Sequence, residues 1–362
     1  MNLLSPVTGV AGRLARPVGD LMTAARIVTD WRMPLLLAVS KGFITPVYRA
    51  AWLASATGTG VLAALAVRPC DLESLAERLG VPPESREDLQ RLRAWLDMGV
   101  RLGEIDRREG AYRLRSIAAR TFAHAGNDAL AAALEEVLRF HVPVLLGAPR
   151  MAATGERFAL ADQDGLVIAR STRVVEPLVR AAIDRVLERD KPQRLLEIGC
   201  GSGSHVKYAA ELNPRLSALA VDLQADVAET ATKNMAEWGL ADRVETRQGD
   251  LRTLDLEPQF DLVTLHNNIY YFPEHERTAA LERARALLAP GGRLLLTTSC
   301  QGGSIGLDVL SLWFTYAEFG GPLPHEDELR AQLESAGFTG IEVHRPVPRE
   351  QFRAFTAVNE TA

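Results

Sequence analysis

An acidic residue followed by three regularly spaced glycines is the part of this sequence that points most clearly to chemistry. Residues 195–203 read Leu-Leu-Glu-Ile-Gly-Cys-Gly-Ser-Gly, so an apolar run ends at Glu197 and is followed by Gly199, Gly201 and Gly203. Glycine has no Cβ, and these positions therefore allow a sharp turn in which the backbone comes close to a ligand. A buried strand, such a turn and then a helix hold nucleotide-like cofactors in many α/β proteins.

The spacing and the charge of this turn indicate which kind of cofactor it binds. A dinucleotide pattern, G-x-G-x-x-G, needs its third glycine at position 204, where this chain has Ser204. The carboxylate of Glu197 would repel a diphosphate and attract a cationic ligand. Two further acids follow apolar runs, Asp222 and Asp250. A carboxylate at position 222 could accept hydrogen bonds from both hydroxyls of a ribose.

Five segments in fixed order carry a family resemblance. They are EIGCGSG (197–203), VDL (221–223), GDL (249–251), FDLVTLHNNIYYF (260–272) and LLAPGGRLLL (287–296). On these segments, residues 194–300 resemble the core of class I S-adenosylmethionine-dependent methyltransferases. The resemblance implies S-adenosylmethionine as cofactor, with Asp222 on the ribose hydroxyls and Asp250 on the adenine amino group. The cofactor-binding residues that it implies are Glu197, Gly199, Gly201, Gly203, Asp222, Leu223, Asp250, Leu251, His266 and Asn267.

The element pattern of the second half predicts an α/β fold with a doubly wound, mostly parallel sheet. A helix over about 174–188 precedes the first strand, and strands and helices then alternate along the chain. The last two strands are expected over 341–344 and 352–358. Because too few residues separate them for a helical crossover, this pair should be antiparallel. The family resemblance implies a seven-stranded, Rossmann-like sheet with this reversed last strand.

The first third of the chain predicts helices followed by a hairpin. Helices are expected near Val61, over 71–79 and over 86–98, with strands at 103–105 and 111–114. This order is that of a winged helix, and it resembles the N-terminal dimerisation region of small-molecule O-methyltransferases. The resemblance implies a homodimer. The domains expected are 1–125 (mainly helical, winged-helix, dimerisation), 126–189 (helical connection and substrate cover) and 190–362 (cofactor binding and catalysis).

Composition places limits on partners and location. The chain has 362 residues, 47% hydrophobic and 24% charged, with a net charge of −5, which gives no reason to expect a nucleic acid or an anionic membrane as partner. The helix over 86–98 mixes acidic and basic residues, which argues against DNA binding. Three cysteines without C-x-x-C spacing predict neither a structural metal site nor a disulfide framework. No convincing signal peptide or membrane span is visible, so a cytoplasmic protein is expected.

Two residues after the strand at 260–265 are candidates for a catalytic base. His266 has the side chain whose pKa ordinarily lies near working pH, although its ring nitrogens could instead only satisfy nearby backbone groups. In plant-type O-methyltransferases a catalytic histidine precedes an acidic pair, and aligning that pair on Glu274 places Tyr270 at the histidine position. His205 and His325 are weaker candidates, each more typical of a surface or helix-start histidine.

Aromatic and basic residues suggest where the methyl acceptor binds. An apolar helix over 307–319 could cover the site after the glycine-rich loop at 301–306, although its aromatic residues could equally be core. No D/N/S-P-P-Y/F/W tetrapeptide follows the fourth strand, which weakens a nucleobase amine as acceptor. The substrate-binding residues expected are Tyr271, Arg170, Trp313 and Tyr316.

These observations predict an enzyme that transfers a methyl group from S-adenosylmethionine to a small biosynthetic molecule, most readily to oxygen. Methylation of carbon or nitrogen is the alternative among enzymes. A winged-helix regulator that uses the cofactor fold as a sensor is the alternative from another class, and intact Glu197, Asp222 and Asp250 favour turnover over a sensor.

Overall fold

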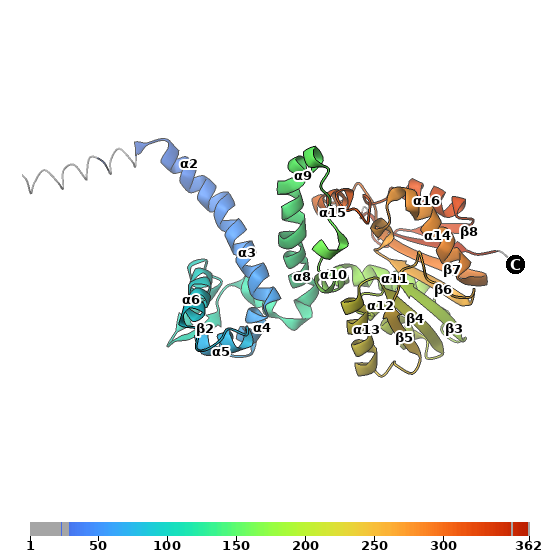
Figure 1. Ribbon diagram of the computed structural model, residues 1–362, viewed down its shortest axis with the longest axis horizontal. Helices are drawn as coiled ribbons and strands as arrows, with labels where there is room; N and C mark the ends of the chain where they lie inside the picture. The colour runs from blue at the N-terminus through green and yellow to red at the C-terminus, as the bar shows by residue number, and fades with distance from the viewer. Residues whose placement is uncertain (1–22, 24–28, 349, 361–362) are drawn as a thin grey trace, which may run out of the picture. The chain divides into compact units, whose positions relative to one another are not determined.

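The computed structural model describes residues 23, 29–348 and 350–360 of the chain. These residues form two compact units: one combines the described residues up to 53 with 68–119, and the other combines 54–67 with the described residues from 120 onward. Figure 1 follows the elements from the blue N-terminal helices to the red final strands.

The first unit contains two of the predicted helices and the predicted hairpin, whose first strand lies at 105–108 instead of the expected 103–105. Asp71 caps its α5 by accepting a hydrogen bond from the Ser74 backbone N–H, and Ser85 caps α6 in the same way through Asp88. The side chain of Glu104 is fully buried, where it pairs with Arg49 at 2.5 Å and accepts from Ser116. The elements are α2 (Arg32–Val39), a π-turn (Ser40–Ile44), α3 (Thr45–Gly58, which continues into the second unit), α5 (Leu72–Arg78), α6 (Arg86–Arg101), β1 (Ile105–Arg108) and β2 (Ala111–Leu114).

A run of helices precedes the sheet in the second unit. The helix expected near Val61 is α4. A further helical run begins at Asp128 and is interrupted by a π-turn. The helix that leads into the first strand ends at Val186. These elements are α4 (Val61–Val67), α7 (Ile117–Ala123), α8 (Asp128–Glu136), the π-turn (Val137–His141), α9 (Val142–Thr154), α10 (Gly165–Ser171) and α11 (Glu176–Val186).

The sheet of the second unit has seven strands in the order β5-β4-β3-β6-β7-β9-β8, which confirms the predicted doubly wound, mostly parallel sheet. Only β9 runs antiparallel to its neighbours, and it pairs with both β7 and β8. The predicted antiparallel final pair is therefore confirmed. The strands are β3 (Gln193–Ile198), β4 (Leu216–Asp222), β5 (Val244–Gln248), β6 (Phe260–His266), β7 (Leu288–Ser299), β8 (Thr339–His344) and β9 (Phe352–Val358).

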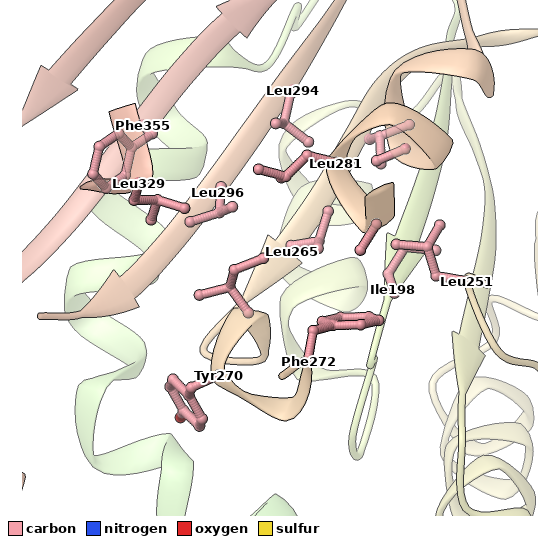
Figure 2. Packing of buried hydrophobic residues seen from close by; sticks show 14 of the residues in the cluster. Ile198, Leu251, Leu265, Tyr270, Phe272, Leu281, Leu294, Leu296, Leu329 and Phe355 are labelled. Carbon is pink, nitrogen blue, oxygen red and sulfur yellow. The ribbon is translucent and has the colours of Figure 1, made fainter. Parts of the chain in front are cut away.

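Helices cover both faces of this sheet. Apolar side chains of α11, α12 (Ser204–Leu212) and α13 (Ala225–Glu237) pack with one face in a single buried cluster. The other face packs against α14 (Arg277–Ala286), α15 (Ile305–Thr315) and α16 (Glu326–Ser335). The central strands are buried on both sides, which is why their sequences read as nearly unbroken apolar runs. Figure 2 shows part of the second cluster.

The strand order reverses at β3, because β4 lies on one side of it and β6 on the other. In open parallel sheets ligands bind outside the carboxyl ends of the strands at such a switch point. Glu197, Asp222 and His266 lie at or next to the carboxyl ends of these three strands.

Among the described residues, no single helix is both long and apolar enough to cross a membrane. The helices over 32–58 and 61–67 reach the required length and composition only when taken together as a bent pair.

Candidate active site

A pocket opens at the carboxyl ends of β3, β4, β5 and β6, and α10 forms part of its wall. It lies within the second unit. Eight of the ten predicted cofactor-binding residues line it; of the other two, Glu197 lies near the end of β3 and Gly203 lies at the end of the glycine turn. The lining residues are Leu160, Gly165, Ile168, Ala169, Thr172, Ile198, Gly199, Gly201, Asp222, Leu223, Gln224, Val227, Gly249, Asp250, Leu251, Arg252, His266, Asn267, Asn268, Tyr271 and Phe272.

The turn after β3 depends on its glycines. Gly199, Gly201 and Gly203 have φ values of +66°, +56° and +79°, a backbone region that other residues rarely adopt. A Cβ on Gly199 would lie 2.6 Å from Nδ2 of Asn268, and the Asn268 amide itself donates to the Ile198 carbonyl. The turn therefore brings bare backbone to the wall of the pocket, as the sequence predicted.

Glu197 is 1% exposed, and its Oε1 has no hydrogen-bond partner within the protein. Burial raises the pKa of its carboxyl group, while His205 beside it acts in the opposite direction. An unpartnered buried acceptor is costly to leave unsatisfied, so this oxygen fits a cationic ligand. S-Adenosylmethionine carries a sulfonium and an ammonium group, and the residues present therefore fit the cofactor that the sequence implied.

Asp222 ends β4 and holds the glycine turn in place. Its Oδ2 accepts from the Gly201 backbone N–H at 2.9 Å, and its Oδ1 accepts from the Gln224 N–H at 3.1 Å. Burial raises the pKa of this carboxyl group, whereas those two hydrogen bonds oppose the shift. Each oxygen retains a second lone pair for a ligand hydroxyl. Leu223 lines the pocket next to it.

Asp250 has a partner that the sequence analysis did not foresee. The guanidinium of Arg252, two residues further on, donates through Nε to both carboxylate oxygens at 3.1 and 3.0 Å. The Asp250 carboxylate therefore shares its lone pairs between Arg252 and any ligand. Leu251 between them is 2% exposed and packs in the core under the pocket, near Ile198 and Phe272 (Figure 2).

His266 is the last residue of β6 and lines the pocket, and one of its ring nitrogens has no partner among the described residues. Its Nδ1 lies 2.8 Å from Oγ1 of Thr297, and its Nε2 is buried without a partner. Burial, followed by the nearby His205, lowers the pKa of His266 well below its ordinary value. The ring is therefore neutral at physiological pH. Asn267 after it has φ +54° and donates its backbone N–H to Thr297.

Tyr270 and Tyr271 lie on a short 3₁₀ turn, Ile269–Tyr271, and have different surroundings. Tyr270 is 5% exposed, packs edge to face on Phe314 at 4.7 Å, and does not line the pocket. Burial raises the pKa of its phenol well above the ordinary value, so the hydroxyl stays protonated. Tyr271 does line the pocket, and its hydroxyl donates to Gln163 at 3.0 Å. In Figure 2, Tyr270 points away from the side of the cluster that holds Ile198 and Phe272.

The other expected substrate residues lie outside the pocket wall. Trp313 is 2% exposed and stacks on Phe158 at 5.3 Å inside an aromatic cluster. Tyr316 is half-buried beside the same cluster. Arg170 is engaged by Asp128, with Nη2 to Oδ1 at 2.6 Å, which leaves its charge largely neutralised.

The sequence analysis missed the wall that α10 contributes. Gly165 opens this helix, and a Cβ there would lie 2.2 Å from Oε1 of Gln224. Ile168, Ala169 and Thr172 line the pocket from the same side. The glycine at the first position of a helix, after a capping Asp164, is the one sequence signal that marks this close approach.

Comparisons with known proteins identify a methyltransferase domain in this chain. Residues 195–292 match the family model described as a methyltransferase domain. Demethylspheroidene O-methyltransferase of Rhodobacter capsulatus is 26% identical over 188 residues, which cover 50% of this chain and 46% of that enzyme. The 3-hydroxy-5-methyl-1-naphthoate 3-O-methyltransferase of Streptomyces sahachiroi is 24% identical over 263 residues, or 70% and 74% of the two chains. The chain thus matches about half the length of the first of these relatives.

A solved structure extends the likeness to the whole fold. Human N-acetylserotonin methyltransferase in complex with S-adenosylmethionine superimposes with a TM-score of 0.64 at 19% identity, covering 92% of this chain and 99% of that one. Fold, pocket and family model together define the class of this domain: residues 195–292 belong to the methyltransferase-domain family, and the cofactor is S-adenosylmethionine. The superposition covers nearly the whole chain, so the N-terminal helical region is part of the shared fold.

Proposed function

We propose that this protein transfers the methyl group of S-adenosylmethionine to an oxygen atom of a small biosynthetic molecule. The observation that carries the proposal is the free, buried Nε2 of His266 at the pocket wall. S-Adenosylmethionine supplies a methyl group activated on a sulfonium. The chain has to orient the acceptor, exclude water and, where the acceptor is a hydroxyl, take its proton.

His266 is suited to the proton transfer. If Nδ1 carries its hydrogen and donates to Thr297, Nε2 presents a lone pair to the pocket. Its depressed pKa keeps that lone pair available at neutral pH. Tyr270 remains the second candidate by alignment, but its raised pKa restricts its phenol to donating a hydrogen bond rather than accepting a proton. Tyr271 at the pocket wall is the substrate contact that we propose.

The reaction can be tested without knowing the acceptor. Purified protein incubated with methyl-labelled cofactor and fractionated small-molecule extracts should yield a labelled product whose methyl group has the proton and carbon chemical shifts of a methoxy group. A product methylated on carbon or nitrogen would contradict the oxygen assignment while leaving methyl transfer intact. Labelled protein or DNA, with no small-molecule product, would contradict a small-molecule acceptor.

We further propose that the chain forms a homodimer through its N-terminal helices. Seven large apolar side chains between Trp31 and Tyr48 are 53–73% exposed, which is more apolar surface than a monomer usually leaves in contact with water. They are Trp31, Leu35, Leu36, Leu37, Phe43, Val47 and Tyr48.

The dimer should be visible by light scattering at micromolar concentration as twice the chain mass of 39.5 kDa. The double variant Phe43→Ser/Tyr48→Ser should shift the molecules toward monomer, because two of the most exposed apolar groups are lost, while near-UV circular dichroism stays unchanged. A monomeric wild type with the fold intact would reject this proposal.

A further inference from the structure

Three buried polar atoms beside the glycine turn face the same small region without a hydrogen-bond partner. They are Oε1 of Glu197, Nε2 of His205 and Nε2 of His266. One side-chain atom from each of these three residues lies within 4.8 Å of the others. Buried polar atoms are nearly always paired in folded proteins, so an unpaired group of three points to a ligand.

His205 is the member of this group that the proposed function does not use. It is the second residue of α12, at the end of the helix where the backbone dipole favours negative charge. Its Nδ1 lies 3.5 Å from Oε1 of Glu197, and its ring meets that of His266 edge to face at 4.9 Å. Nδ1 is therefore the ring nitrogen directed at the carboxylate, and Nε2 is the nitrogen left for a ligand. A protonated ring offers a second donor at Nε2.

The charged residues that line the pocket do not account for binding of the cofactor's carboxylate group. Glu197 suits the ammonium group of the cofactor's amino-acid end but repels the carboxylate beside it. Arg252 is the one lysine or arginine among the described residues that line the pocket, and it is held by Asp250. The carboxylate at the amino-acid end of the cofactor therefore needs a hydrogen-bond donor close to Glu197, and the ring of His205 lies there.

We propose that His205, held by Glu197, binds the carboxylate of the cofactor's amino-acid end, while Glu197 accepts from its ammonium group. The pair would thus recognise both charged groups of the amino-acid end together, with Glu197 as the acceptor and His205 as the donor. This inference rests on S-adenosylmethionine being the cofactor, and its test is a binding measurement that needs no acceptor.

The test compares two ligands that differ only in the carboxylate. Calorimetry should show that wild-type protein binds S-adenosylmethionine about 10- to 100-fold more tightly than decarboxylated S-adenosylmethionine, the range for a hydrogen bond to a charged group. In His205→Ala this preference should disappear, because affinity for the complete cofactor falls while affinity for the decarboxylated one stays the same. His205→Gln keeps a neutral donor and should recover part of the preference.

His275→Ala is the matched control, since that side chain is 82% exposed, and it should behave as wild type. An equal loss of both ligands in His205→Ala would show that His205 only supports the fold, and an unchanged preference would show that another group binds the carboxylate. Either result overturns the inference. If wild-type protein bound neither ligand, the cofactor assignment itself would fail, which is a distinguishable outcome.

Glu197, His205 and His266 are also residue types that bind divalent metals. The same titrations are therefore repeated after chelation and with added Zn²⁺, together with metal analysis of the purified protein. Unchanged binding and no bound metal support carboxylate recognition. One metal per chain, with cofactor affinity lost on chelation, would overturn it.

Discussion

Replacing His266 by alanine is expected to lower kcat by about 10²–10⁴-fold, the usual contribution of a positioned general base. The acceptor hydroxyl would lose the group that takes its proton, whereas the contacts of Asp222 and the glycine turn with the cofactor remain. The dissociation constant for S-adenosylhomocysteine should therefore change little. The measurement is kcat of the variant with an identified acceptor, beside calorimetry with S-adenosylhomocysteine.

The pH dependence provides an independent check of the same residue. Because the pKa of His266 is lowered, the ring loses its proton at a lower pH than an ordinary histidine and is already a base at neutral pH. The kcat/KM of the wild type should thus stay level from about pH 8 down to the ordinary histidine value of about 6.5, and fall only below it.

Two variants test whether catalysis uses a side-chain base at all. Tyr270→Phe removes only the hydroxyl, and with the phenol protonated throughout, its kcat should fall much less than that of His266→Ala. If both variants lose less than about threefold, far short of the contribution of a general base, catalysis rests on alignment and neither residue is a base. That result would fit an acceptor that is already ionised, such as a carboxylate or an acidic phenol.

Asp222→Ala is expected to weaken binding of S-adenosylhomocysteine by about 1–3 kcal/mol, the scale for hydrogen bonds to a charged group left unmade. The substitution removes the acceptor for the ribose hydroxyls and leaves the N–H groups of Gly201 and Gln224 without their partner. Asp222→Asn keeps one oxygen and should lose less. Calorimetry measures both variants, and a thermal melt confirms that they are folded.

Unchanged affinity in a folded Asp222→Ala protein would remove Asp222 from the cofactor site. The wild type should show no heat of binding with NAD, since Glu197 lies where a diphosphate would be repelled. Binding of NAD without binding of S-adenosylhomocysteine would contradict the cofactor assignment as a whole.

The sequence predicted those parts of the fold that depend on local pattern. Strands β3, β4 and β6 are buried on both faces and therefore read as apolar runs, and the glycines after β3 mark a turn that other residues cannot form. The short connection between β8 and β9 left an antiparallel pair as the only arrangement. Each of these features depends on residues that lie close together in the sequence.

What the sequence could not show depends on contacts between distant residues. Arg170 looked free to bind an acidic substrate, but its partner Asp128 lies 42 positions away. Tyr270 matched a catalytic position by alignment, yet the distant Phe314 packs against its ring. His205, Glu197 and His266 likewise come together only because α12, β3 and β6 meet in the fold, and no short sequence motif predicts this grouping.

The position of β9 has a consequence for how the catalytic domain assembles. This strand follows β8 in the chain but lies between β7 and β8 in the sheet, and β8 pairs with no other strand. During synthesis β8 therefore emerges with both edges unpaired, and the sheet through β7 ends in an exposed edge until β9 is available. A nascent chain stopped before Phe352 presents three unpaired strand edges at once, two on β8 and one on β7, and such edges favour aggregation.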